Sequence, residues 1–117
     1  KKYTAAEKNL RTVLERERQQ QSNFHTANVY NLLGLIYMQK GELQRAKVLF
    51  QQSLHLEQSK QRCEGMVADY ADLALIEKLS GDEDSARHNL QIALEYAKKT
   101  ENSELIDLID QKIAHLN

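Results

Sequence analysis

The chain has 117 residues, of which 16 are basic and 17 are acidic, so its formal net charge is −1 at pH 7. Because charges of both signs are mixed along the sequence, we expect neither a nucleic-acid-binding nor a membrane-surface protein. No apolar run approaches the roughly 20 residues that cross a bilayer. The 41% hydrophobic content, the absence of proline and the presence of only four glycines favour an all-α fold. The single cysteine, Cys63, suits a reducing compartment, and we predict a soluble cytoplasmic protein.

A 40-residue repeat organises the sequence. Ala6, Ala46 and Ala86 stand 40 residues apart, and apolar residues around them recur at the same step, for example Phe50 and Leu90. Such a period is typical of arrays built from one repeated helical unit. The repeat therefore predicts a single array over residues 1–117.

Taken in chain order, the apolar periodicity predicts six helices that are antiparallel to their neighbours, because only short breaks separate them. They span residues 3–21, 23–39, 43–60, 63–80, 83–100 and 103–116. We name the first, third and fifth B helices, and the second, fourth and sixth A helices. The divisions of the array are a truncated repeat at 1–21, full repeats at 23–60 and 63–100, and a terminal helix at 103–117.

Recurring residues mark the ends of these helices. Gly41 and Gly81 each follow an apolar stretch and precede acidic residues, as expected for a helix C-terminus followed by a new N-terminus. Asn23 and Ser103 are good N-cap residues at the start of A helices. Every predicted helix is thus bounded by a break that recurs in the repeat.

Small residues are predicted where helices cross. Gly34 and Ala74 on A helices would face Ala46 and Ala86 on the following B helices, with large residues such as Phe50 filling the space beside them. A bulky substitution would push the two backbones apart.

The residues of the first full repeat resemble the tetratricopeptide repeat (TPR), whose signature places an aromatic residue, Leu-Gly, Tyr, Ala and Phe in this order. They are Tyr30, Leu33, Gly34, Tyr37, Gly41, Ala46 and Phe50. The second repeat matches with Tyr70, Leu73, Ala74, Gly81, Ala86, Leu90 and Ala93. It departs from the pattern at Glu77, which stands where the first repeat has Tyr37, and both repeats lack the late proline of the family. The 40-residue period is similar to the long-helix variant of the family.

The resemblance implies a right-handed superhelix whose A helices line a concave face that binds a segment of another protein. The implied contact residues are Phe24, Asn28, Asn31, Leu35, Met38, Glu64, Ala68, Asp72, Leu75, Lys78, Gln111 and His115. The same face would present Gln39, Ala71, Leu79, Leu108 and Lys112. Core packing is an equal alternative for Leu35 and Leu75. Asn31 and Asp72 are expected to face solvent, because a polar side chain on an apolar helix needs water or a partner.

No residue pattern predicts catalysis, a metal or another cofactor. The four histidines, at positions 25, 55, 88 and 115, lack the spacing of a metal site, and Cys63 has no nearby His or Asp to activate it. The acidic residues at 82–84 could suggest calcium, but a capped helix start explains them better. An acidic stripe at positions 101, 104, 107 and 110 is read as a solvated face, with a docking site for a basic partner as the alternative.

These observations predict a non-enzymatic protein-interaction module, a scaffold or adaptor that binds a peptide segment or helix of a partner. The alternative is a ligand- or peptide-sensing regulatory segment of a larger signalling or transcription-regulating protein. The first B helix has no A helix before it in this sequence, and the last A helix has no following B helix. We therefore also expect self-association through the terminal helices.

Overall fold

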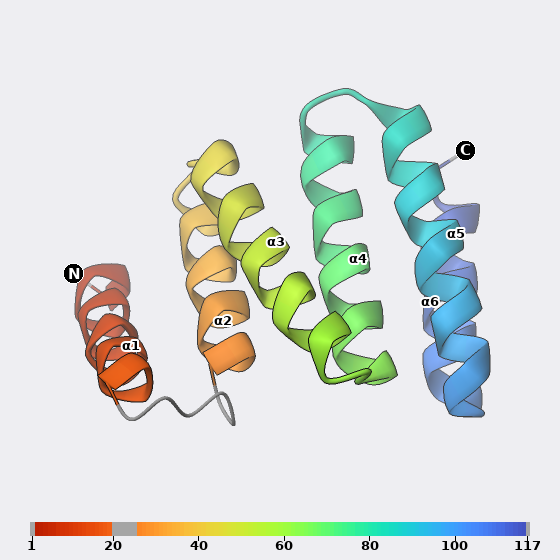
Figure 1. Ribbon diagram of the computed structural model, residues 1–117. Coiled ribbons are helices and arrows are strands. Elements are labelled where there is room, and N and C mark those ends of the chain that lie inside the picture. Colours follow the sequence, from red (N-terminus) through yellow and green to blue (C-terminus); the bar gives the residue numbers. More distant parts are fainter. Residues whose placement is uncertain (1, 20–25, 117) are drawn as a thin grey trace. The chain divides into compact units, whose positions relative to one another are not determined.

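The computed structural model describes residues 2–19 and 26–116, and within α1 it describes the side chains of residues 4–16. These residues form six α-helices and no strand (Figure 1). The helices are α1 (Lys2–Gln19), α2 (Thr26–Gln39), α3 (Leu43–Ser59), α4 (Cys63–Leu79), α5 (Glu83–Thr100) and α6 (Ser103–Ala114). The all-α class and the six predicted helices are confirmed. The predicted cap Asn23 and the start of the second predicted helix lie outside the described residues.

None of the helices in the described part of the chain is long and apolar enough to cross a membrane.

Four turns, which end α2, α3, α4 and α5, each place one residue in the left-handed region. These residues are Gly41 (φ 82°), Gln61 (φ 55°), Gly81 (φ 86°) and Glu101 (φ 57°), spaced 20 positions apart. In the first three turns the next amide donates to the carbonyl oxygen five residues earlier, at 2.9, 3.0 and 2.8 Å. This is the Schellman arrangement, which pairs carbonyl groups that the helix end leaves open. The prediction that Gly41 and Gly81 end helices is confirmed.

Acidic and amide side chains cap the last two helices. The Asp82 carboxylate accepts from the backbone N–H of Ser85 at 3.1 Å and from the Ser85 hydroxyl at 2.7 Å, so the acidic segment begins a capped helix. The prediction that Ser103 caps α6 is wrong. Asn102 is the cap, and its side chain accepts from the amide of Leu105 at 3.2 Å. Both residue types can cap a helix. Asn102 takes the position because it directly follows the left-handed Glu101, which ends α5.

Internal contacts divide the chain into two compact units, Lys1–Leu56 (unit 1) and Glu57–Asn117 (unit 2). Unit 1 contains α1, α2 and most of α3. Unit 2 contains the last residues of α3 together with α4, α5 and α6. Each unit is described separately below.

The core of unit 1 depends on a close approach between α2 and α3. Leu33, Ala46 and Phe50 are completely buried. A Cβ atom added to Gly34 would lie 2.7 Å from Cε1 of the Phe50 ring, which is too close for two carbon atoms. The absence of a side chain at Gly34 therefore leaves room for the Phe50 ring. Ala6 is exposed although its repeat counterpart Ala46 is buried, because no helix in the described part of the chain covers that side of α1.

Tyr37 connects α1 to α2. Its hydroxyl donates to the Glu7 carboxylate and accepts from Nη2 of Arg11 at 2.7 Å, while Nζ of Lys40 lies 3.2 Å from the same carboxylate. The hydrogen bond from Tyr37 and the charges of Lys40 and Arg11 lower the pKa of Glu7. The Arg45 guanidinium lies 5.0 Å from the centre of the Tyr37 ring. Residues of α1, α2 and α3 thus share one cluster around Tyr37.

In unit 2, small residues on α5 allow α4, α5 and α6 to pack side by side (Figure 1). One buried cluster contains Val67, Ala93, Ala97 and Ile109, and another contains Ala74, Ala86, Leu90 and Leu116. The rings of Tyr70 and Tyr96 stack beside the first cluster, with their centres 6.0 Å apart. Each cluster draws residues from all three helices or their ends, so these helices form one core.

Candidate partner-binding site

The residues implied by the repeat resemblance fall largely on exposed or half-buried positions, as a binding face requires. On α2, Asn28 is exposed, whereas Asn31, Leu35 and Met38 are half-buried. In unit 2 the exposed members are Glu64, Ala68, Leu75, Lys78, Gln111 and His115. Phe24 lies outside the described residues.

Asn31 and Asp72 match the prediction made for them only in part. Both are half-buried, so each faces solvent with part of its surface, and each also interacts with another group of the protein. The amphipathic pattern could not reveal this, because a polar residue near the edge of a helix face can be satisfied by a neighbouring side chain as well as by water.

A pocket of about 240 Å³ lies in unit 2 between α4, α5 and the end of α6. Its lining consists of Ala71, Ala74, Leu75, Lys78, Leu90, Lys112, His115 and Leu116. The structure thus brings predicted groove residues of two A helices together at one place, although Lys78 and Lys112 are 34 positions apart in the sequence. The other predicted residues do not line this pocket.

The floor of the pocket is apolar. Ala74, Leu90 and Leu116 are buried, and they belong to one core cluster. Leu75 stands at the rim with 38% of its surface exposed. The sequence analysis placed Ala74 and Leu90 at packing positions of the repeat, because periodicity identifies the buried face of each helix but not where that face remains open between helices. The pocket is therefore an open edge of the core of unit 2.

Three nitrogen-bearing side chains surround this floor. Within the described part of the chain, Lys78 and Lys112 form no hydrogen bond or ion pair through their side chains, and no carboxylate lines the pocket. Nδ1 of His115 lies 2.7 Å from the carbonyl oxygen of Gln111. Because a carbonyl oxygen only accepts, Nδ1 carries the proton of this bond, and in the neutral ring Nε2 is the acceptor. The site combines apolar surface with two available cations.

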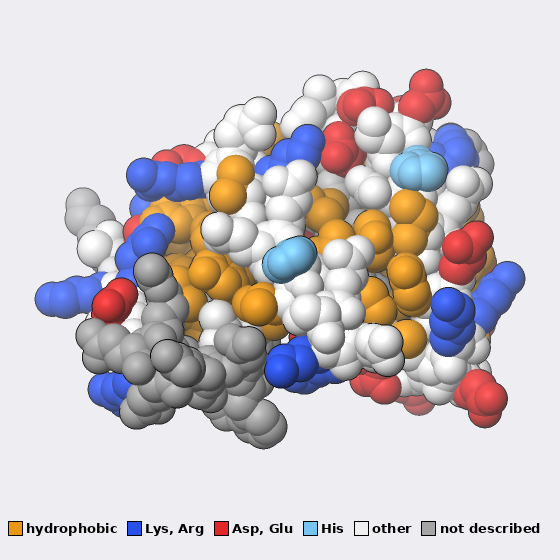
Figure 2. All heavy atoms as spheres, viewed as in Figure 1, with side chains coloured by type: hydrophobic (Ala, Val, Ile, Leu, Met, Phe, Trp, Pro, Cys, Tyr) orange, Lys and Arg blue, Asp and Glu red, His pale blue; other side chains and the backbone are white. Residues whose placement is uncertain are grey.

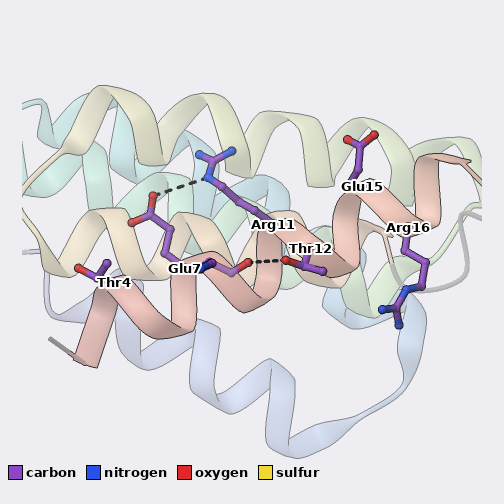
Figure 3. Close-up of a pocket in the computed structure, with 7 residues that line it drawn as sticks. Thr4, Glu7, Arg11, Thr12, Glu15 and Arg16 are labelled. Carbon is purple, nitrogen blue, oxygen red and sulfur yellow. Dashed lines mark hydrogen bonds and ion pairs between the residues drawn. The ribbon is translucent and has the colours of Figure 1, made fainter.

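Two other hollows are less suited to a partner. A depression of about 620 Å³ runs along α1 and is lined only by residues of that helix among those described (Figure 3). Glu7 and Arg11 pair there at 3.6 Å, and the Thr12 hydroxyl donates to the carbonyl oxygen of Lys8 at 3.0 Å. One helix face cannot enclose a ligand. The third hollow, about 420 Å³ between α2 and α3, contains none of the predicted contact residues.

Neither the charges on the face shown in Figure 2 nor the possible metal ligands of the described residues indicate a further site. On the face shown in Figure 2, basic and acidic side chains are dispersed rather than gathered by sign. Among the described residues, no three His, Cys, Asp or Glu side chains are grouped so that they could hold a metal ion. Cys63, the first residue of α4, is a half-buried free thiol.

Comparison of the chain with protein-family models, with curated proteins and with solved structures gave no significant match. The pocket geometry and the residues around it are therefore the basis for a functional proposal.

Proposed function

We propose that this chain is a non-catalytic protein-interaction module, a scaffold or adaptor that binds a segment of another protein at the pocket between α4 and α6. The observation that carries the proposal is that Leu75 and Lys78 of α4 converge with Lys112 of α6 and with His115, which follows α6, on one apolar floor. A partner side chain placed there loses its contact with water, and the surrounding polar groups fix its orientation.

We further propose that the helices belong to a TPR-like array in a cytoplasmic protein. Support comes from the equal 20-residue spacing of the left-handed turn residues. It also comes from the complete burial of Ala46 and Ala86 at matching positions, and from the close approach of Phe50 to Gly34. The single free thiol of Cys63 suits a reducing compartment.

The size of the pocket favours a peptide side chain over a drug-sized ligand. Sites that enclose such ligands measure roughly 300–1,000 Å³, whereas this pocket measures about 240 Å³. Burial of one leucine side chain contributes about 1.5–3 kcal/mol, but association costs about 4–15 kcal/mol in lost freedom. One pocket therefore supports only weak binding, and a segment that also contacts exposed groups on α4, such as Glu64 and Ala68, would bind more tightly.

Selection from a random peptide library tests the proposal. Peptides are selected on the wild-type chain and then measured on Leu75→Lys and on Leu32→Lys. The two leucines are matched because each has 38% of its surface exposed, but only Leu75 lines the pocket. We expect the selected peptides to lose binding to Leu75→Lys and to keep binding to Leu32→Lys. Selection of no peptide that distinguishes these variants would contradict the proposal, provided that circular dichroism shows both to be folded.

A further inference from the structure

The charges around the pocket between α4 and α6 restrict the kind of segment that it accepts. Lys78 lies in the last turn of α4 and Lys112 in the last turn of α6, and both side chains are exposed. They approach the pocket from two different helices, and no carboxylate lines the space between them. The chain as a whole has a formal net charge of −1, so this concentration of positive charge is local.

The negative ends of the helix dipoles oppose the positive charges of these lysines, so the two contributions must be compared. The pocket lies toward the carboxyl ends of α4 and α6, and each helix end carries a partial charge of about −0.5. Together the two ends contribute about −1 against +2 from Lys78 and Lys112. The dipole effect also weakens within one helical turn. Among the groups that line the pocket, the two lysine charges therefore outweigh the two helix ends, and an acidic group is favoured there.

We propose that the partner segment is acidic as well as apolar. This proposal rests on the proposed function, because it specifies the chemistry of the segment that the pocket binds. An apolar side chain occupies the floor formed by Ala74, Leu90 and Leu116. Aspartate or glutamate residues on both sides of it pair with Lys78 and Lys112, which reach the pocket from two different helices. This pattern, an apolar residue between acidic ones, differs from a purely apolar or a basic segment.

The lysines contribute selectivity more than affinity. Both are exposed to water, so each ion pair changes the dissociation constant by only about 1.5- to 5-fold. Loss of both lysines therefore weakens binding of an acidic segment by about 2- to 25-fold if the two effects multiply. Salt reduces this effect, because the Debye length falls from about 10 Å at 0.1 M to about 3 Å at 1 M.

The test uses three short synthetic peptides that share a central leucine and differ only in the flanking residues, which are glutamate, glutamine or lysine. Each is titrated into the full isotope-labelled chain, and amide shifts in two-dimensional NMR spectra give the location and the dissociation constant. The variants are Lys78→Gln/Lys112→Gln and, as the matched control, Lys98→Gln. Lys98 is also an exposed lysine in the last turn of its helix, α5, but it does not line the pocket.

We expect the glutamate peptide to bind most tightly and to shift amides around Leu75 and Lys112. The double variant should bind it as weakly as the glutamine peptide, and Lys98→Gln should bind like wild type. Equal binding of the glutamine peptide at the same amides would overturn the acidic specificity while leaving the proposed function intact. If no peptide shifts these amides, the acidic specificity is also overturned, and the library selection decides separately whether the pocket binds peptides.

Discussion

The pair formed by Gly34 and Phe50 gives a sharp test of how the helices pack. Substitution of Gly34 by alanine would place a Cβ atom 2.7–2.9 Å from three atoms of the Phe50 ring, which is completely buried. At the matching positions 40 residues later, Ala74 and Leu90 belong to one buried cluster. A larger residue on the A helix therefore accompanies a smaller one on the B helix.

The magnitudes follow from this geometry. Overpacking lowers the free energy of unfolding by about 1–3 kcal/mol. Replacement of glycine by alanine inside a helix raises it by about 1 kcal/mol. Gly34→Ala should therefore lower the free energy of unfolding by about 1 kcal/mol, and Phe50→Leu alone by about 1–2 kcal/mol through the space that it leaves. In the double variant the new methyl group occupies part of that space. Its stability should return to within about 1 kcal/mol of wild type.

The assay is guanidinium unfolding of the four proteins in a double-mutant cycle, followed by circular dichroism. The expected coupling energy is about 2 kcal/mol in favour of the double variant, within the usual range for residues in contact. Gly65→Ala is the control. There the new methyl group meets the carboxylate of Glu57, which is buried and lies 3.5 Å from Arg62. Displacement of this carboxylate opposes the gain in helix propensity, so we expect a loss of stability that Phe50→Leu does not relieve.

Additive effects in the cycle would refute this reasoning. If the double variant is destabilised by the sum of the two single changes, the ring and the glycine do not compete for the same space. The repeat positions would then not be interchangeable between the two units.

Two further predictions concern the turns and the Tyr37 cluster. Gln61→Gly and Glu101→Gly should each raise the free energy of unfolding by about 0.5–1 kcal/mol, because both residues have positive φ without being glycine. Gly81→Ala should lower it by about 1 kcal/mol for backbone reasons alone, since an added Cβ would have no atom within 4 Å; denaturant unfolding measures all three. The pKa of Glu7 is lowered by its hydrogen bond from Tyr37 and by the nearby Lys40 and Arg11. Its stabilising effect is therefore complete above its ordinary pKa near 4.5 and is lost as the pH falls through the lower folded-state pKa. The difference in thermal stability between wild type and Glu7→Gln should close over that acidic range, and a difference that persists unchanged would contradict the assigned cluster.

The elements that could be predicted are those specified by local sequence. Apolar periodicity placed the helices within a few residues, and Gly41 and Gly81 marked two helix ends because glycine adopts positive φ at little cost. The same reasoning could not identify Gln61 and Glu101 as left-handed residues. The helices on both sides require their conformation, and neither glutamine nor glutamate is a residue type that predicts positive φ.

The site was predictable only in part, because its formation depends on residues distant in sequence. Lys78, Lys112 and His115 could be assigned to A helices from the repeat, but their convergence depends on the packing of α4 and α6 with α5. Ala6 shows the same limit. It shares a pattern with Ala46 and Ala86, yet it is exposed because burial depends on the neighbouring helix and not on the repeat position itself.

The equal spacing of the left-handed turn residues also determines which changes of chain length the protein can accept. One residue inserted in the middle of α4 would rotate every later side chain of that helix by about 100°, which would carry Leu73 and Ala74 away from the core. An insertion beside Gly81 leaves the apolar faces of both adjoining helices unchanged, because that turn is exposed. In the proposed repeat array, loss or duplication of a single helix would reverse the direction of every helix after it. In the proposed array, a helix pair of 40 residues can instead be added or removed without altering the orientation of the rest, so it is the smallest helical unit that such a chain can gain or lose.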